Sequence, residues 1–283
     1  MTTDAVCETA PAKINLCLHV TGRRLDGYHL LDSLVVFADV ADRIFASPAR
    51  GLSLVVAGPE GAGLQAEPDN LVLRAARVMG AKDAALVLDK RLPVASGIGG
   101  GSADAAAALR ALARLTGLPP PSESEILQLG ADVPVCLKGR PARMTGIGEH
   151  VAPLPPLPPL SCVLVNPRLP VPTPQVFAAL QSRTNPPLPD PPPAALPTAE
   201  AFTSWLDLHS RNDLVSPARL VAPILAKVQA ALEDTPDCLL ARMTGSGGTH
   251  FGLYATPHAA RTAAGVLRAA HPFWWIESGR ILD

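Results

Sequence analysis

The chain has 283 residues, of which 48% are hydrophobic and 17% are charged, and its formal net charge is −1 at pH 7. This length supports two domains or one large one, and the apolar content excludes global disorder. The near-neutral charge argues against a nucleic acid or a polybasic membrane contact as partner. We expect a monomer or a weak homodimer.

The cysteines and the absence of export signals indicate a cytoplasmic protein. The five cysteines show no C-x-x-C spacing and leave an odd number, which is typical of reduced thiols. The seven histidines form no H-E-x-x-H pattern, so a zinc site is not expected. Residues 1–13 lack an apolar signal region, and no apolar run approaches the roughly 18 residues of a membrane span.

The first predicted element is a strand over residues 13–20, where apolar and polar residues alternate. The alternation predicts a half-buried strand whose polar face carries Lys13 and Asn15. An Asp-Gly turn signal at 26–27 and an apolar run over 30–40 then predict an antiparallel hairpin, with Tyr28 and His29 just past the turn.

Residues 92–108 read LPVASGIGGGSADAAAA and predict a glycine loop that leads into a helix. Before this loop we expect a strand over 52–57, a helix that is capped at residues 69–70 and ends near Met79, and a second strand over 85–89. Four glycines within five positions allow a ligand to approach bare backbone, and Ser102 is the predicted N-cap of a helix that stops at Gly117. Backbone N–H groups at such a helix start favour phosphate.

A purely structural glycine turn is the alternative, because such turns before helices are common. The loop also fails the familiar phosphate-binding patterns. No lysine follows Gly101 as Walker A requires, and Ser102 stands where the dinucleotide fingerprint needs its last glycine. The protein-kinase loop fails at the same place.

Asp132 is the candidate general base of the chain. A capping-box pattern at Ser122 and Glu125 predicts a short helix that ends near Gly130. Asp132 follows this helix, and Pro134 is expected to hold Val133 in an extended conformation. Lys13 would lower the pKa of a nearby aspartate or hydroxyl. Each residue alone also has an ordinary explanation, Asp132 as a turn residue and Lys13 as a surface charge.

Prolines mark the predicted domain boundary. Of the 31 prolines, 16 fall between residues 153 and 197. The cluster at 153–159 separates domains over residues 1–155 and 156–283, and the cluster at 185–197 predicts a loop or mobile segment outside the core. The remaining elements are helices over 223–232 and 258–270 and strands over 239–243, 251–255 and 273–276, with a second glycine turn at 245–248.

Three segments resemble the three motifs of the GHMP kinase superfamily in order and spacing. They are PAKINLCLHV with Gly-Tyr-His after it, LPVASGIGGGSADAAA, and ARMTGSGGTHFGLY. Finer matches are DNL at 69–71, LGADVPVCLKG at 129–139, TGIGE at 145–149, VPTPQVF at 171–177 and NDL at 212–214. The ordered set covers nearly the whole chain.

The resemblance implies an α+β fold of two domains, the first like a domain of certain ribosomal proteins and the second ferredoxin-like, with the active site in the cleft between them. It implies ATP-dependent phosphorylation of the 2-hydroxyl of 4-diphosphocytidyl-2-C-methyl-D-erythritol in the non-mevalonate route to isoprenoids. ATP and Mg²⁺ are the implied cofactors, and a small cytidine-diphosphate-linked alcohol is the implied partner.

The resemblance also implies roles for individual residues. Asp132 resembles the catalytic base and Lys13 its charged partner. The residues expected to bind ATP are Asn70, Pro93, Ser96, Gly97, Ile98, Gly99, Gly100, Gly101 and Ser102. The residues expected to bind the alcohol are Asn15, Tyr28, His29, Thr173, Phe177, Gly245, Ser246 and Gly247. Among these, the rings of Tyr28 and Phe177 would stack on cytosine, and His29 would read its polar edge.

One position departs from the pattern, because Ala103 stands where many members have a second serine that serves magnesium. The magnesium ligand is therefore left open between Ser102 and a metal held by phosphates and water. For Asp104 we expect a role in first-turn helix electrostatics.

Three alternatives accompany this interpretation. A GHMP kinase acting on mevalonate or homoserine is the nearest, although the Gly-Tyr-His and Pro-Thr-Pro-x-x-Phe segments favour a cytidine-bearing substrate. A nucleotide-binding module without catalysis is the second. An RNA-binding protein is the third, and the near-neutral charge disfavours it.

Overall fold

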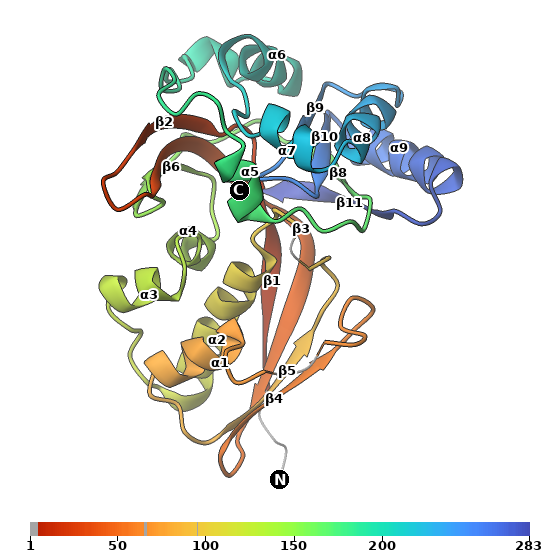
Figure 1. Cartoon of the computed structure of the whole chain (residues 1–283). Coiled ribbons are helices and arrows are strands. Elements are labelled where there is room, and N and C mark those ends of the chain that lie inside the picture. The colour runs from red at the N-terminus through yellow and green to blue at the C-terminus, as the bar shows by residue number, and fades with distance from the viewer. Residues whose placement is uncertain (1–4, 65–66, 95) are drawn as a thin grey trace. The chain divides into compact units, whose positions relative to one another are not determined.

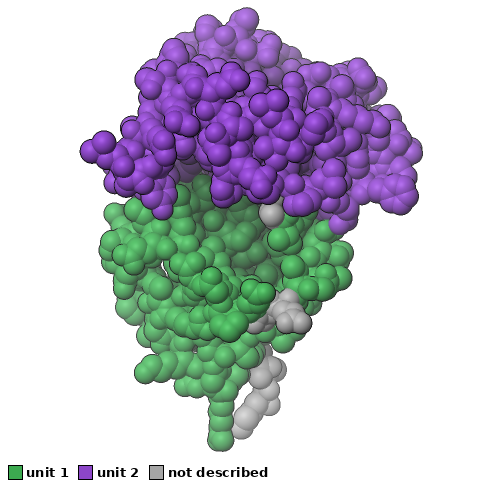
Figure 2. Space-filling model, in the orientation of Figure 1, with its two compact units in different colours: residues 1–12, 41–94, 99–139 green, residues 13–40, 95–98, 140–283 purple. Residues whose placement is uncertain are grey.

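The computed structural model describes residues 5–64, 67–94 and 96–283. The chain forms two compact units, which Figure 2 colours separately. Unit 1 comprises Met1–Ala12, Ala41–Val94 and Gly99–Gly139, and unit 2 comprises Lys13–Val40, Ala95–Ile98 and Arg140–Asp283. Strands β1 (Val6–Asn15) and β3 (His29–Ser47) contribute residues to both units. The expected domain boundary at residue 155 stays a prediction.

Unit 1 contains a small sheet and a group of helices that pack on one another (Figure 1). Strand β4 (Leu52–Ala57) pairs in parallel with β5 (Ala84–Asp89), and β5 pairs antiparallel with the end of β3. The helices are α1 (Leu71–Val78), α2 (Gly100–Thr116), α3 (Glu123–Leu129) and α4 (Val133–Lys138). The alanine run of α2 is buried, and its small side chains let α1 and α4 pack closely against it.

In unit 1, two predicted helix caps are confirmed, one predicted cap is wrong, and one predicted backbone conformation is wrong. Asn70 caps α1, and the capping box of α3 forms as predicted. The predicted cap at Ser102 is wrong, because α2 begins at Gly100 after Gly99, whose φ of 64° costs a glycine nothing. The extended conformation expected before Pro134 is also wrong. Val133 is the first residue of α4, and Pro134 follows it in the first turn, where the missing N–H of proline is not needed.

The C-terminal part of unit 2 is ferredoxin-like, as expected. Strands β8 (Ser161–Asn166), β9 (Leu240–Met243), β10 (His250–Tyr254) and β11 (Trp275–Leu282) form an antiparallel sheet in the order β11-β8-β10-β9. Helices α8 (Ile224–Glu233) and α9 (Pro257–Ala270) pack against it. Between β8 and α8 lie α5 (Thr173–Ala178), η1 (Pro193–Ala195), α6 (Ala199–His209) and α7 (Val215–Val221).

The predicted hairpin is present in unit 2, but the strand before it differs from the prediction. Strand β2 (His19–Arg23) pairs antiparallel with β3, which also pairs with β6 (Ala142–Gly146), and β6 pairs with β7 (His150–Pro153). The predicted strand over 13–20 is divided, because β1 ends at Asn15 before β2 begins. Residues 13–20 are all buried, so the prediction of a half-buried strand was wrong. Hydrogen bonds satisfy several of their polar groups.

The proline-rich segment over 185–197 holds only the 3-10 turn η1, as its composition predicted. Its expected place outside the core is wrong, because Leu188 and Ala195 are buried. No helix among the described residues is long and apolar enough to cross a membrane.

Candidate active site

Two glycine segments that lie far apart in the sequence meet in unit 2. Gly97 has φ +73°, and a Cβ on it would lie 2.5 Å from the carbonyl oxygen of Gly247. Gly245 has φ +57°, and a Cβ on it would lie 2.6 Å from the Gly97 carbonyl oxygen. The Thr249 N–H also donates to the Ser96 carbonyl at 3.0 Å. This close backbone contact explains why both positions need glycine.

The end of β1 is joined to both of these loops. The Asn15 N–H donates to Thr244 Oγ1 at 2.8 Å, and this hydroxyl donates to the Gly97 carbonyl at 3.4 Å. The Lys13 N–H donates to the Ile98 carbonyl at 3.0 Å. Thr244 was missed by the sequence analysis, although its place directly before the second glycine turn was a usable signal.

The side chains of Lys13 and Asn15 are buried and connected to each other. The Lys13 ammonium donates to Asn15 Oδ1 at 3.1 Å, and Asn15 Nδ2 donates to Ser33 Oγ at 2.7 Å. Ser33 in turn donates to the Cys17 carbonyl at 2.6 Å. Lys13 is only 4% exposed, so its ordinary explanation as a surface charge is wrong. A buried ammonium needs polar partners, and Asn15 is one of them.

The hairpin tip and α5 place aromatic rings together in unit 2. The rings of His29 and Phe177 stack with centroids 4.8 Å apart and an interplanar angle of 26°. Loss of solvent and the positive charges nearby lower the pKa of His29, which keeps it neutral at pH 7. Tyr28 is 61% exposed. Thr173 of α5 and Ser246 of the second glycine turn share a hydrogen bond of 2.7 Å between their hydroxyls.

The start of α2 in unit 1 fits a phosphate group. The first N–H groups of any α-helix lack intrahelical partners, and Gly99, the N-cap residue of this 17-residue helix, has no side chain that could cap them. A Cβ on Gly101 would meet nothing within 4 Å, so this turn is open to a ligand. Such a helix start binds anions through its N–H groups and its dipole.

Unit 1 also brings Ser102 close to the turn that carries Asp132. The Ser102 Oγ lies 3.8 Å from the position of a Cβ on Gly130. Asp132 is the N-cap residue of α4, but its carboxylate makes no capping hydrogen bond there. Asn70 caps α1 by accepting from the Val72 N–H at 2.9 Å. The contact of Asn70 with adenine stays a prediction, as do the nucleotide contacts of the other expected residues.

A buried ion triad behind the glycine loop was missed by the sequence analysis. The Lys90 ammonium donates to Asp42, and to Asp104 at 3.0 Å, and Asp42 also accepts from the Leu92 N–H at 2.8 Å. Burial, more than any other cause, raises the pKa of Asp104 to about 7. The expected first-turn role of Asp104 is therefore wrong, because the side chain pairs inside the core. An acid within a run of buried alanines was the available signal.

Lys13 belongs to unit 2 and Asp132 to unit 1, so their expected partnership stays a prediction. Among the residues that the structure describes, no group of three or more His, Cys, Asp or Glu side chains could hold a metal ion. The magnesium ligand stays a prediction, open between the Ser102 hydroxyl and a metal held by phosphates and water.

Comparison with known proteins identifies the class of kinases to which these features belong. The profile of the GHMP kinases N terminal domain matches residues 70–142, and that of the GHMP kinases C terminal domain matches residues 195–272. A 4-diphosphocytidyl-2-C-methyl-D-erythritol kinase of Cereibacter sphaeroides is 59% identical over 274 residues, which cover 96% of this chain and 98% of that protein.

Solved structures agree with the sequence matches. A crystal structure of 4-(cytidine 5'-diphospho)-2C-methyl-D-erythritol kinase superposes with a TM-score of 0.80 at 35% identity, covering 98% of this chain and 99% of that one. L. major mevalonate kinase in complex with R-mevalonate shares the fold at a TM-score of 0.68 and 15% identity, covering 96% and 95%. The chain belongs to the GHMP kinase family.

Proposed function

We propose that the protein transfers the γ-phosphoryl group of ATP to the 2-hydroxyl of 4-diphosphocytidyl-2-C-methyl-D-erythritol, in non-mevalonate isoprenoid synthesis. The uncapped, open start of α2 is the observation that supports phosphate binding. Near full-length similarity to relatives that carry this kinase name supports the substrate.

In this proposal Asp132 accepts the proton of the attacking hydroxyl. Lys13 lowers the pKa of that hydroxyl, and Asn15 orients the alcohol. The N–H groups at the start of α2 hold the phosphates of ATP. Magnesium, when bound, would neutralise phosphate charge, and the Ser102 hydroxyl with phosphates and water would hold it.

The cytidine part of the substrate is proposed to bind at the hairpin tip. His29 and Phe177 already stack, and Tyr28 has an exposed ring that is available to a base. Neutral His29 has both a donor and an acceptor nitrogen for the polar edge of cytosine. The second glycine turn and Thr173 would hold the rest of the substrate.

Replacing Tyr28 by Ala tests this pocket. Stacking of an aromatic ring on a base contributes about 1–3 kcal/mol, so KM for the cytidine substrate should rise about ten- to a hundredfold. The KM for ATP should stay unchanged. Steady-state kinetics measure both values, and an unchanged KM for the cytidine substrate would remove Tyr28 from the pocket.

A coupled ADP-release assay with a panel of alcohols tests the proposed function as a whole. The panel contains 4-diphosphocytidyl-2-C-methyl-D-erythritol, mevalonate and homoserine. We expect turnover with the first alone. Equal turnover of mevalonate or homoserine would support the alternative kinase, and ATP binding without ADP release from any alcohol would support a non-catalytic module.

A further inference from the structure

The proline-rich residues 185–190, which we call the strap, are attached to the hairpin of β2 and β3 at three points within unit 2. At the first point, the Asn185 N–H donates to the Val20 carbonyl at 3.0 Å. The Asn185 side chain also donates to Asp213 at 3.1 Å, and Asp213 accepts from the Val20 N–H at 2.7 Å. Both backbone polar groups of Val20 are therefore bound outside the β2–β3 pairing.

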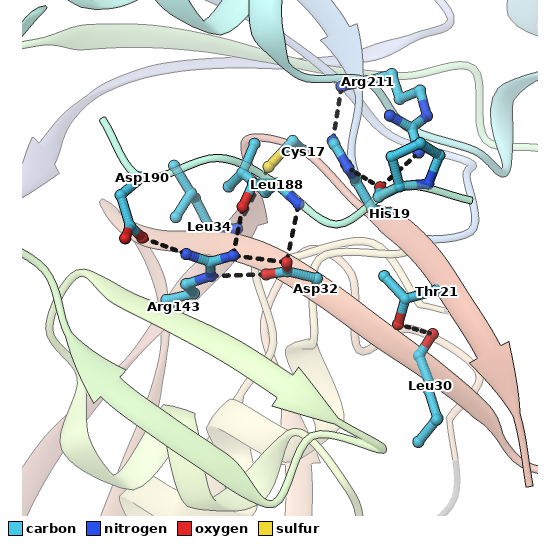
Figure 3. Close-up of polar contacts among 11 residues, drawn as sticks. Cys17, His19, Thr21, Leu30, Asp32, Leu34, Arg143, Leu188, Asp190 and Arg211 are labelled. Atoms are coloured by element: carbon cyan, nitrogen blue, oxygen red, sulfur yellow. Dashed lines mark hydrogen bonds and ion pairs between the residues drawn. The ribbon is translucent and has the colours of Figure 1, made fainter. Parts of the chain in front are cut away.

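The second attachment is made by His19. The Pro186 carbonyl can only accept, so His19 Nδ1 donates to it across 3.1 Å. His19 Nε2 then accepts from the Arg211 N–H at 3.1 Å, and the Arg211 guanidinium donates to the same Pro186 carbonyl at 2.9 Å. Figure 3 shows these contacts around the buried imidazole.

The third attachment is an ion pair between the buried Asp32 of β3 and the partly buried Arg143 of β6 (Figure 3). The Arg143 guanidinium donates twice to the Asp32 carboxylate, at 2.8 and 2.7 Å. The pair also binds both backbone groups of Leu188, because the Leu188 N–H donates to Asp32 at 2.9 Å and its carbonyl accepts from Arg143. The Leu188 side chain is buried, whereas Asp190, which pairs with the same guanidinium, is 89% exposed.

We infer that Asp32 and Arg143, acting through the strap, are positioning residues that fix the β2–β3 hairpin and so determine affinity for the cytidine part of the substrate. This inference rests on the proposed function. Asp32 pairs directly with His19 across the hairpin, three residues after His29. A planar bidentate pair fixes geometry as well as charge, so it holds the strand that leads from the hairpin tip. The proline content limits the conformations open to the strap.

The test replaces both charges together, as Asp32→Leu with Arg143→Met. Removing one partner would leave a buried charge uncompensated, whereas an apolar pair of similar volume usually folds. We expect KM for the cytidine-linked alcohol to rise about tenfold, while kcat and the KM for ATP change by less than about twofold. Hydrogen exchange of amides 19–31 should become faster, with exchange in α9 unchanged.

Asp190→Ala is the matched control, because it removes the exposed partner of Arg143 and should alter neither measurement. A folded double variant with the parent's KM and hairpin exchange would overturn the inference, as would faster exchange with an unchanged KM. If the double variant does not fold, Leu188→Ala is judged by the same two measurements, because it removes the buried anchor of the strap. Faster hairpin exchange together with no turnover of the cytidine substrate by the parent enzyme would instead reject the proposed function.

Discussion

Asp132 combines a position on a tight turn with a carboxylate that its own helix does not use. The residue follows Gly130, whose neighbourhood includes the Ser102 hydroxyl at the start of α2. A carboxylate at this turn has the chemistry of a general base, because it can accept the proton of an attacking hydroxyl.

We expect Asp132→Asn to lower kcat by about 10²–10⁴-fold, because a positioned base contributes that much to proton transfer. ATP affinity should persist, since the phosphates are proposed to bind the α2 start. The coupled assay gives kcat, and calorimetry gives the ATP affinity. Asp237→Asn is the control, because Asp237 lies in an exposed turn with φ 60° that asparagine also tolerates. A near-normal kcat in the Asp132 variant would refute the assignment.

At the scale of elements, a substitution in the first turn of α2 tests phosphate binding with less disturbance of the packing than a substitution in the glycine loop before it. Gly97 cannot be replaced without a clash against Gly247, and a Cβ on Gly100 would lie 3.1 Å from the Lys90 ammonium. Gly101 faces open space within the helix. Its substitution therefore changes the surface that a ligand would meet and leaves the packing of unit 1 intact.

Gly101→Val should weaken ATP binding by at least about tenfold, or about 1.4 kcal/mol, because the branched side chain blocks close approach to the backbone. Stability should not fall, since valine has a better helix propensity than glycine. Gly265→Val is the matched control, because Gly265 lies in α9 with nothing within 4 Å of its Cβ position. Calorimetry with ATP compares the two variants, and equal affinities would show that the phosphate site is misplaced.

The triad of Lys90, Asp42 and Asp104 joins β3 and α2 to the residue that follows β5. We expect Lys90→Met to cost about 3–5 kcal/mol of the free energy of unfolding, because it leaves two buried carboxylates without their cation. Arg24→Met breaks an exposed pair with Asp26 and should cost less than about 1 kcal/mol. Urea unfolding of both variants gives the comparison. Similar small losses would mean that the triad contributes little to stability.

At the scale of the whole molecule, acid stability should depend on His250 of β10. Both ring nitrogens of this buried residue lack hydrogen-bond partners among the described residues. Burial, with the nearby charge of Arg219, lowers the pKa of His250 to about 3. Between this value and the unfolded value of 6.5, the unfolded state binds more protons, so stability falls as the pH falls.

His250 should change the free energy of unfolding by at most about 1.4 kcal/mol per pH unit, because one proton is involved. His250→Leu should remove it, and the free energy of unfolding should then vary less between pH 5 and 6.5. At pH 7 the variant should be at least as stable as the parent, because two unpaired polar atoms leave the core. Urea unfolding across this pH range decides the question, and parallel curves for the two proteins would contradict it.

Local patterns were sufficient to predict much of this fold. The predicted caps of α1 and α3 and the predicted glycine stop of α2 are confirmed, because helix ends are governed by contacts within a few residues. The resemblance to the GHMP kinases predicted the ferredoxin-like sheet. The order and spacing of the three motifs predicted the family.

The tertiary structure decided what lies on each side of those elements. Alternation over residues 13–20 predicted one exposed face, but other elements cover it, and a pattern along one strand does not reveal its neighbours. The ion pair of Lys90 with Asp104 and the strap attachment at Asp32 join residues 14 and 156 positions apart. Such contacts depend on how elements pack. The sequence by itself therefore determined the family and the local elements, while the packing determined which polar residues became buried and paired.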